Sequence, residues 1–146
     1  MAARKKILEE KSKRTDAENQ LLTTGLLLLD TVYFQSTNWE VSVNSRPYLN
    51  VIAKMLTKYP KLLVEVGGHT ENLGKDNYNM ALSLTRAQSV MNYLRKVSPK
   101  LRNCLSARGY GTAQTRAGFT SLDGRKQYRR TELQVLNLDA LVEYYP

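Results

Sequence analysis

The stretch VEVGGHTENLGKDNYNMALSLTRAQSVMNYL, residues 64–94, decides the fold of this 146-residue chain. It opens with a short alternating apolar run, passes through Gly67 and Gly68, and continues into a segment with helical periodicity. The two glycines are predicted to break a strand over residues 61–66, and a helix is expected from about Asp76 to Val97. The expected buried stripe of that helix has spacings of 4, 3, 4 and 3 residues: Met80, Leu84, Ala87, Met91 and Leu94.

The segments on both sides complete the predicted order of elements. An apolar run over residues 26–34 predicts a strand, and a helix is expected to start near Pro47, with Asn44 and Ser45 as capping candidates, and to stop at Pro60. Further strands are expected at residues 105–107 and 131–138. The order β-α-β-α-β-β favours an α/β sandwich in which two helices pack on one face of a mixed sheet.

The composition is that of one globular domain preceded by an arm. Hydrophobic residues make up 42% of the chain, which is enough for a real core. Residues 1–20 are charged and nearly without large apolar side chains, so we expect a solvated helix or a linker there and a domain over residues 21–146. No apolar run approaches the ~18–20 residues that cross a bilayer, and we expect no secretion signal in this chain.

Charge is unevenly distributed along the chain. The net charge is +9, and the stretch from Arg95 to Arg130 holds ten bases and one acid, Asp123. This asymmetry predicts a positive face that attracts an anionic partner. Nucleic acid, anionic lipid and the carboxylate-bearing cell wall all meet that description, and charge alone leaves the choice open.

Polar residues on the second helix suggest a binding site. Asn79, Ser83 and Arg86 are spaced to form one stripe, roughly 100° from the predicted buried stripe. They would lie beside residues 67–71, where a strand end, glycines and a helix start form an anion-binding corner. Glu71 and Arg86 offer opposite charges, which would suit a zwitterionic ligand, although an ordinary salt bridge between the two explains them equally well.

Catalysis is not expected. One His and one Cys make a transition-metal site of soft ligands very unpromising, and no cofactor is indicated. His69 is expected to be a structural hydrogen-bonding residue, Cys104 a small buried hydrophobe, and the abundant tyrosines, Tyr110 among them, to cover the edges of the core. No second carboxylate suits hydrolysis beside Glu71, so we predict a non-enzymatic protein.

Residues 64–94 resemble the signature of OmpA-like domains, which runs G-H-T-D, a glycine three residues on, and then N-x-x-L-S-x-x-R-A-x-x-V. The matching positions are Gly68-His69-Thr70-Glu71, Gly74, Asn79, Leu82-Ser83, Arg86-Ala87 and Val90. The stretches VYF (32–34), ARGYG (107–111) and GRKQYRRTEL (124–133) resemble further family motifs in the right order. The resemblance spans roughly residues 25–136 and implies the β-α-β-α-β-β fold.

The resemblance also implies a function. OmpA-like domains occur in outer-membrane proteins, lipoproteins and flagellar stator proteins of the MotB type. The family's function is to bind peptidoglycan non-covalently through the diaminopimelate of the stem peptide. This implies a periplasmic, envelope-associated anchor attached to a membrane protein or complex. Stator-type relatives pair through this domain, which leaves both a monomer and a homodimer open. No nucleic-acid partner is expected, because the sequence contains no recognised nucleic-acid fold motif. The implied principal contacts are Glu71 and Arg86; the other expected ligand-binding residues are Thr70, Asn79, Ser83, Arg129 and Arg130.

Two positions depart from the family pattern. Glu71 replaces an aspartate, so its carboxylate reaches one methylene further, and Tyr128 replaces an asparagine with a much larger ring. A pocket that holds ligand groups at hydrogen-bonding distance is sensitive to both changes. The alternative function is therefore a structural or assembly module that keeps the fold and has lost or altered wall binding.

Overall fold

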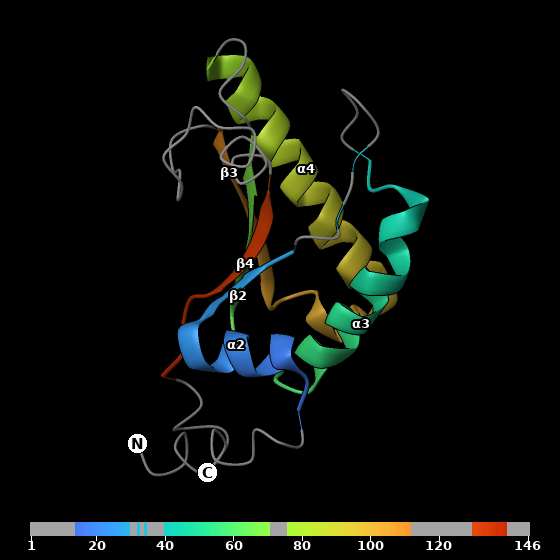
Figure 1. Cartoon of the computed structure of the whole chain (residues 1–146), viewed down its shortest axis with the longest axis vertical. Helices are drawn as coiled ribbons and strands as arrows, with labels where there is room; N and C mark the ends of the chain where they lie inside the picture. The colour runs from blue at the N-terminus through green and yellow to red at the C-terminus, as the bar shows by residue number, and fades with distance from the viewer. Residues whose placement is uncertain are drawn as a thin grey trace.

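The structure, a computed structural model, describes residues 14–29, 32, 34, 40–70, 76–111 and 130–139. The chain folds in the order α2 (Asp16–Thr24), β1 (Leu26–Leu28), η2 (Val43–Ser45), α3 (Arg46–Thr57), β2 (Val64–His69), α4 (Asp76–Val97), η3 (Pro99–Leu101), β3 (Leu105–Gly111) and β4 (Thr131–Val135), as Figure 1 shows. The predicted order of strands and helices is confirmed, with α2 as an additional first helix.

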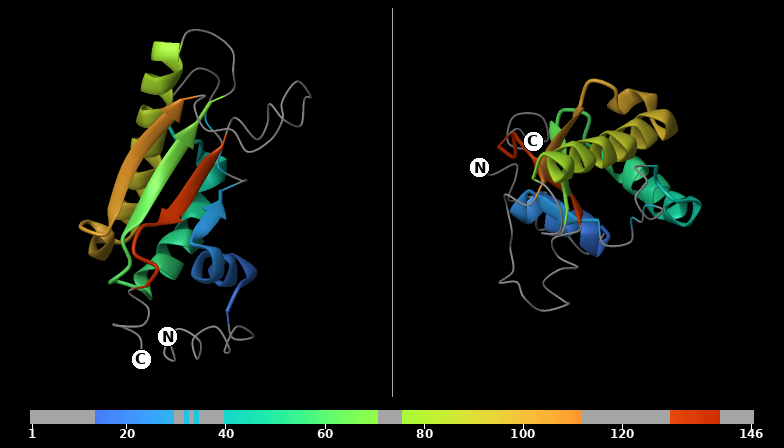
Figure 2. Two further views of the ribbon diagram at one scale, coloured as in Figure 1. Left: turned by 90° about the vertical axis from the view of Figure 1, so that its left-hand side faces the viewer. Right: turned by 90° about the horizontal axis from the view of Figure 1, so that it is seen from above.

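Four strands form one open mixed sheet in the order β1-β4-β2-β3. Strands β2 and β3 are parallel, whereas β4 is antiparallel to both β1 and β2. Parallel neighbours need a crossover connection, and α4 provides it between β2 and β3. Figure 2 shows α3 and α4 on one face of the sheet, with α2 at the end near β1. The predicted sandwich of two helices on one face of a mixed sheet is confirmed.

The core lies between this helical layer and the inner face of the sheet. Its centre is formed by aliphatic side chains that are at most 1% exposed, among them Leu22, Leu49, Ile52, Val66, Val90, Leu94 and Leu133. Burying each such side chain contributes about 1.5–3 kcal/mol to folding. Helix α3 supplies Leu49 and Ile52 as predicted. Pro47 lies in its first turn, and Ser45 is its N-cap without a side-chain capping bond.

Helix α2 begins inside the segment that was expected to be a linker, and it crosses the expected domain boundary at Leu21. The Thr15 hydroxyl caps the helix by accepting a hydrogen bond from the Glu18 amide at 3.2 Å. Gly25, with a φ of 76°, ends the helix in the left-handed conformation that glycine adopts readily. Glu18 is 2% exposed and Ala17 packs against the hydrophobic core, so the last residues of the expected arm contact the domain.

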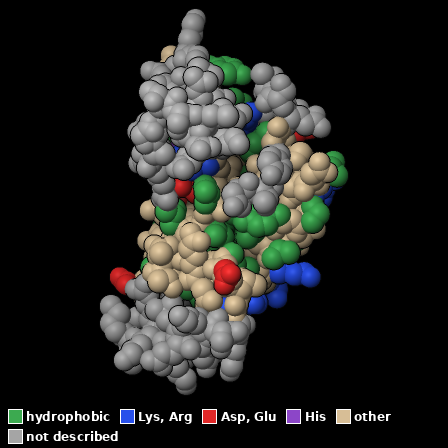
Figure 3. Space-filling model, in the orientation of Figure 1, with side chains coloured by type: hydrophobic (Ala, Val, Ile, Leu, Met, Phe, Trp, Pro, Cys, Tyr) green, Lys and Arg blue, Asp and Glu red, His purple; other side chains and the backbone are tan. Residues whose placement is uncertain are grey.

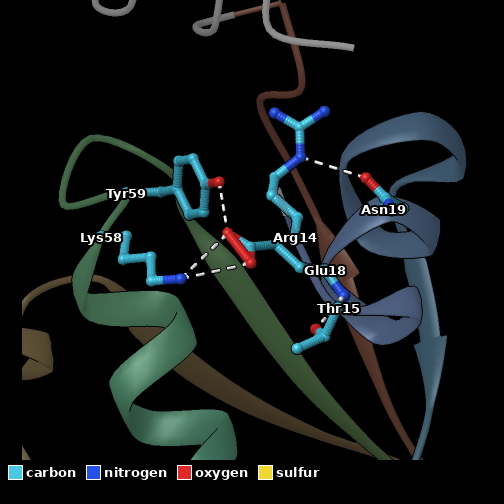
Figure 4. Close-up of polar contacts among 6 residues, drawn as sticks. All are labelled: Arg14, Thr15, Glu18, Asn19, Lys58 and Tyr59. Atoms are coloured by element: carbon cyan, nitrogen blue, oxygen red, sulfur yellow. Dashed lines mark hydrogen bonds and ion pairs between the residues drawn. The ribbon is translucent and has the colours of Figure 1, made fainter. Parts of the chain in front are cut away.

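A helix was one of the two expectations for this segment, but a buried carboxylate within it was not expected. Glu18 is 2% exposed; it accepts a hydrogen bond from the Tyr59 hydroxyl at 2.6 Å and pairs with the Lys58 ammonium at 3.3 Å (Figure 4). Its partners come from the end of α3, forty residues away in the chain. When only its own segment is considered, a charged residue such as Glu18 is expected to be exposed to solvent.

Several strand boundaries differ from the predicted ones. Strand β1 covers residues 26–28 instead of 26–34, and Phe34 forms only an isolated antiparallel bridge with Val41. Strand β4 stops at Val135. The predicted break at Gly67 and Gly68 is wrong, because both residues lie within β2, which has hydrogen-bonded neighbours on both sides. Strand β3 likewise runs through to Gly111.

Candidate functional site

Two glycines bring α4 close to the ends of β2 and β3. A Cβ atom on Gly68 would lie 2.1 Å from the carbonyl oxygen of Ser83, and one on Gly109 would lie 2.5 Å from the amide nitrogen of Leu84. Both distances are far shorter than a van der Waals contact. These glycines are therefore required by the close approach of the helix to the sheet, and not because a strand ends there.

This close approach rotates the buried face of α4 relative to the prediction. Asn79 and Ser83 are only 4% and 0% exposed and lie on the buried face, whereas Met80 and Leu84 are 47% and 37% exposed. Further along the helix, Ala87 and Leu94 are buried as predicted, and Met91 is partly buried against the core. The error arises because the first half of α4 packs against backbone at glycines, where small polar side chains fit and large apolar ones do not.

Ser83 connects the helix to both strand ends. Its hydroxyl donates to the Met80 carbonyl oxygen at 2.9 Å and accepts a hydrogen bond from the Gly111 amide, also at 2.9 Å. The Gly111 carbonyl in turn accepts a hydrogen bond from the Thr70 amide at 2.9 Å. The three elements α4, β3 and β2 are thus joined at one corner, which we call the ligand corner.

A buried charge network lies at the same end of the sheet. Glu132 on β4 accepts a hydrogen bond from His69 Nε2 at 3.1 Å through one carboxylate oxygen, and from Arg130 Nε at 3.2 Å through the other. All three residues are at most 8% exposed. A buried carboxylate with two hydrogen-bonded partners, one of them cationic, offsets its desolvation cost. His69 has the structural hydrogen-bonding contact that the sequence predicted.

Tyr110 extends this network across the outer face of the sheet. Its ring stacks on the His69 imidazole with centroids 4.9 Å apart and an interplanar angle of 7°, and its hydroxyl donates to Glu65. The Arg108 guanidinium lies 4.8 Å from the centroid of the same ring. Burial, followed by the hydrogen bond to Glu65, raises the pKa of Tyr110 above its usual value. Tyr110 is 8% exposed and therefore part of a packed polar layer.

Arg86 lies one helical turn beyond Ser83 on α4. Its guanidinium lies 4.9 Å from the centroid of the Phe34 ring, which is within cation–π range. The side chain is half-buried, and it forms further polar interactions. Contact with an aromatic face restricts the plane of the guanidinium, which favours two-pronged recognition of a carboxylate.

Two buried atoms at the ligand corner are unsatisfied. Among the described residues, no group forms a hydrogen bond with Thr70 Oγ1 or with His69 Nδ1, although both residues are 3% exposed. Because Glu132 accepts from His69 Nε2, that nitrogen carries the proton. An unsatisfied buried polar atom costs about 1–3 kcal/mol, so both atoms favour the arrival of a complementary polar group.

The structure brings Thr70, Asn79 and Ser83 together at the ligand corner and places Arg130 beside His69 at the adjacent strand end. Arg86 lies on the same helix one turn on. Glu71, Arg129 and Tyr128 lie outside the described residues. Cys104 is partly exposed and donates to the Pro60 carbonyl at 3.2 Å, so its expected role as a buried hydrophobe is wrong.

Sequence reasoning missed Glu132 and Glu65 as members of this network. The available signal was position: Glu132 is a charged residue inside the expected strand over residues 131–138. A charge in such a place needs a partner. Its partner His69 comes from 63 residues earlier in the chain, and only the β2–β4 pairing reveals it.

Within the described ranges, no cluster of three or more His, Cys, Asp or Glu side chains is arranged to hold a metal ion. The same part of the chain contains no helix that combines the length and apolarity required to cross a membrane.

The chain is similar in sequence to a known family and to several known proteins. The family model described as "OmpA family" matches residues 33–129. Motility protein B of Bacillus subtilis is 29% identical over 90% of this chain and 52% of its own length. The photosystem I P700 chlorophyll a apoprotein A2 of Gloeobacter violaceus is 34% identical over 75% of this chain, but the match covers only 13% of that protein. The chain thus spans about half or less of these curated relatives.

A solved structure agrees with the family match. The cell wall anchor of the T6SS from Pseudomonas aeruginosa shares 31% identity with this chain, over 75% of this chain and 78% of the other, with a TM-score of 0.64. The family model matches more than half of the chain, and the solved structure has the same fold. The chain belongs to the OmpA family.

Proposed function

We propose that this domain binds peptidoglycan non-covalently through the diaminopimelate of the stem peptide, and that it thereby anchors a membrane protein or an envelope complex to the cell wall. The observation that carries the proposal is the ligand corner. There the buried Thr70 hydroxyl has no partner among the described residues, and Gly111 links Thr70 to the buried Ser83 through hydrogen bonds.

The chemistry of diaminopimelate suits the residues at this corner. Its free end carries an ammonium and a carboxylate on one carbon, so a site needs a cation, an anion and neutral hydrogen-bonding groups. Arg86 supplies the cation in an orientation restricted by Phe34. Glu71 is the proposed anion, and Thr70 the nearest neutral donor. Arg130, held by Glu132, is a second proposed cation from the adjacent strand end, and the neighbouring Arg129 is kept as a proposed contact.

Relatives support the same class of function. The T6SS protein of P. aeruginosa is described as a cell wall anchor, and motility protein B is named for motility. Because the chain spans only part of its curated relatives, the larger assembly is part of the proposal. We propose a periplasmic, envelope-associated location and an attachment to a membrane protein.

The test is calorimetric titration of the chain with a diaminopimelate-containing stem peptide, compared with the same peptide carrying lysine instead. Lysine keeps the ammonium and lacks the carboxylate, so the proposal requires much weaker binding of the lysine peptide. Arg86→Ala should abolish the preference. Arg46→Ala, an exposed arginine at the start of α3, is the matched control and should leave the affinity unchanged. Equal binding of both peptides would disprove diaminopimelate recognition.

A second candidate is an assembly module that keeps the fold without the wall ligand. The departures at Glu71 and Tyr128 favour it. If the chain binds no stem peptide and Glu71→Asp restores saturable binding, the lost-ligand alternative is correct. No binding by either protein would point to a protein partner.

Catalysis and pairing can be tested on the same preparation. We propose that the domain is not an enzyme, so incubation with isolated peptidoglycan should release no soluble muropeptides. Pairing into a homodimer remains a proposal, and sedimentation equilibrium over a range of concentrations would reveal it. A muropeptide product that disappears in Glu71→Gln would overturn the non-enzymatic assignment.

A further inference from the structure

The end of the molecule opposite the ligand corner is strongly basic. Two segments without a single acid cover it: residues 54–63, with Lys54, Lys58 and Lys61, and residues 95–104, with Arg95, Lys96, Lys100 and Arg102. We call this surface the basic end. The wall-binding proposal assigns no role to these residues, although they account for part of the charge asymmetry of the sequence.

Hydrogen bonds hold the two segments side by side. The Thr57 hydroxyl at the end of α3 lies 2.8 Å from the Ser98 hydroxyl just after α4, and the Cys104 thiol donates to the Pro60 carbonyl. The strands that follow, β2 and β3, begin in register with Val64 opposite Leu105. The ends of α3 and α4 and the starts of both strands therefore meet at one end of the molecule (Figure 1).

Most of these bases face solvent. Six of the seven are exposed, Arg95 being intermediate because it donates to the Leu105 carbonyl. The charged residues of neighbouring described segments are the base Arg14 and four acids: Asp16, the buried Glu18 that pairs with Lys58, Glu65 and Asp139. Eight bases against four acids leave a local charge of +4. Figure 3 shows Lys and Arg side chains gathered at this end of the molecule, beside α3.

Exposed aliphatic side chains lie among the bases. Leu63, Val97 and Leu136 are 46%, 38% and 54% exposed. Leu63 and Leu136 are direct neighbours, since the Leu136 amide donates to the Leu63 carbonyl at 2.8 Å. Leu63 follows Lys61 by two residues, and Val97 directly follows Lys96. Leu136 follows the end of β4, beside Leu63. Bases with interspersed large aliphatic residues are typical of surfaces that bind the headgroup region of a bilayer.

Single-stranded nucleic acid fits this surface less well. Single-stranded nucleic acid is bound on aromatic stacking platforms, and the only aromatic residue in the two segments is Tyr59. Its hydroxyl is bonded to buried Glu18, so the ring serves the contact between α2 and α3. Charge without stacking groups, combined with aliphatic side chains, favours a lipid surface.

We propose that the basic end docks on an anionic lipid bilayer, with its lysines at the headgroup phosphates and Leu63, Val97 and Leu136 in the interfacial layer. From Ser83 at the ligand corner to Val97 at its end, helix α4 rises over 14 residues, or about 21 Å at about 1.5 Å per residue. A domain held in this way would present the ligand corner away from the membrane. The proposal does not depend on wall binding, because no residue of the ligand corner takes part.

The test is co-sedimentation of the full chain with vesicles of phosphatidylglycerol and phosphatidylcholine in equal amounts, compared with phosphatidylcholine alone. Binding should require the anionic lipid and should weaken as salt rises above about 0.15 M. Lys96→Gln with Lys100→Gln should reduce the affinity roughly thirtyfold, given the usual contribution of each base near an anionic leaflet. Arg46→Glu changes the net charge by the same −2 at the other end of α3 and should have a much smaller effect.

Three outcomes would overturn the proposal. Equal losses in the two variants would mean that net charge, and not this surface, drives binding. Equal binding to both vesicle types would exclude recognition of anionic lipid. Tighter binding to duplex DNA than to vesicles, lost in the double-glutamine variant, would assign the surface to nucleic acid. Arg86→Ala should bind vesicles normally, so failure of the wall-binding proposal remains distinguishable.

Discussion

The two ends of α4 are built by opposite means. At its start, small and polar residues are buried: Asn79 and Ser83 face glycine backbone, while His69 and Glu132 form a buried charge network nearby. At its end, Val90 and Leu94 fill an ordinary aliphatic core, and the charges lie outside in solvent. The first end is held by close contacts that tolerate little change in side-chain size or polarity. The second end is held by the burial of apolar area, and its surface is characterised by its net charge.

This difference separates two kinds of recognition. A site that selects one small zwitterion needs groups held in place, and buried hydrogen bonds hold them. A surface that meets a fluid anionic layer needs only charge and some apolar area, and it tolerates mobile lysines. Substitutions at the ligand corner should therefore cost folding free energy, whereas those at the basic end should not.

The largest effect is expected at the helix–sheet contact. Gly109→Ala would place a Cβ atom 2.5 Å from the Leu84 amide nitrogen, so α4 must move away from β3. We expect a loss of about 3 kcal/mol in the free energy of unfolding, measured by urea denaturation. Ser106→Ala, at an exposed position on the same strand, is the control, with a change within about 0.5 kcal/mol. An unchanged midpoint for Gly109→Ala would contradict the close packing described here.

The second-largest loss of stability is expected from a substitution in the buried charge network. Glu132→Gln keeps the shape and removes the charge that pairs with Arg130 and accepts from His69. A loss of about 2 kcal/mol is expected, together with weaker binding of the stem peptide, because Arg130 loses its fixed position. The control is Gln134→Ala, a change at an exposed site two residues along β4 that introduces no charge opposite Glu65. If both variants unfold alike, the network contributes nothing specific.

A smaller effect is expected where α2 docks on α3. Tyr59→Phe removes the hydrogen bond to buried Glu18 and should cost about 1 kcal/mol at neutral pH. Burial, followed by that hydrogen bond, raises the pKa of Tyr59 above its ordinary value of 10.0. The unfolded chain therefore loses this proton first, so the stabilisation is complete below about pH 10 and declines as the pH rises further.

The measurement for this prediction is the unfolding free energy from pH 7 to pH 11. The wild-type protein should lose stability more steeply above about pH 10 than Tyr59→Phe. Tyr93→Phe serves as the control, since the hydroxyl of Tyr93 donates to Asn50 in an exposed bond. Parallel pH profiles for wild type and Tyr59→Phe would show that this hydroxyl does not couple to folding.

The smallest effect is expected at the basic end. Replacing both Lys96 and Lys100 by glutamine should change the unfolding free energy by less than about 0.5 kcal/mol, because both side chains are exposed. The same variant is the one expected to lose vesicle binding. A large loss of stability here would make the two ends alike and would remove the distinction between them.

The sequence by itself determined the class of the fold. Periodicity located α4 at its observed bounds and identified Ala87 and Leu94 as buried, since apolar spacing reports helical burial wherever the neighbouring surface is also apolar. Pro47 located the start of α3 for a local reason, its fitness for a first helical turn. The ordered motifs around His69, Arg86 and Gly124 identified the family, which the family match confirms.

Only the tertiary structure decided which polar residues are buried. Met80 and Leu84 satisfied the apolar pattern and are exposed, whereas Asn79, Ser83, Glu18 and Glu132 are buried. Each of these exceptions depends on a partner distant in the chain: a glycine that admits a helix, a tyrosine just after another helix, or a histidine on another strand. The periodicity of one segment carries no information about such partners, because the free energy of burying a polar group depends on what it meets.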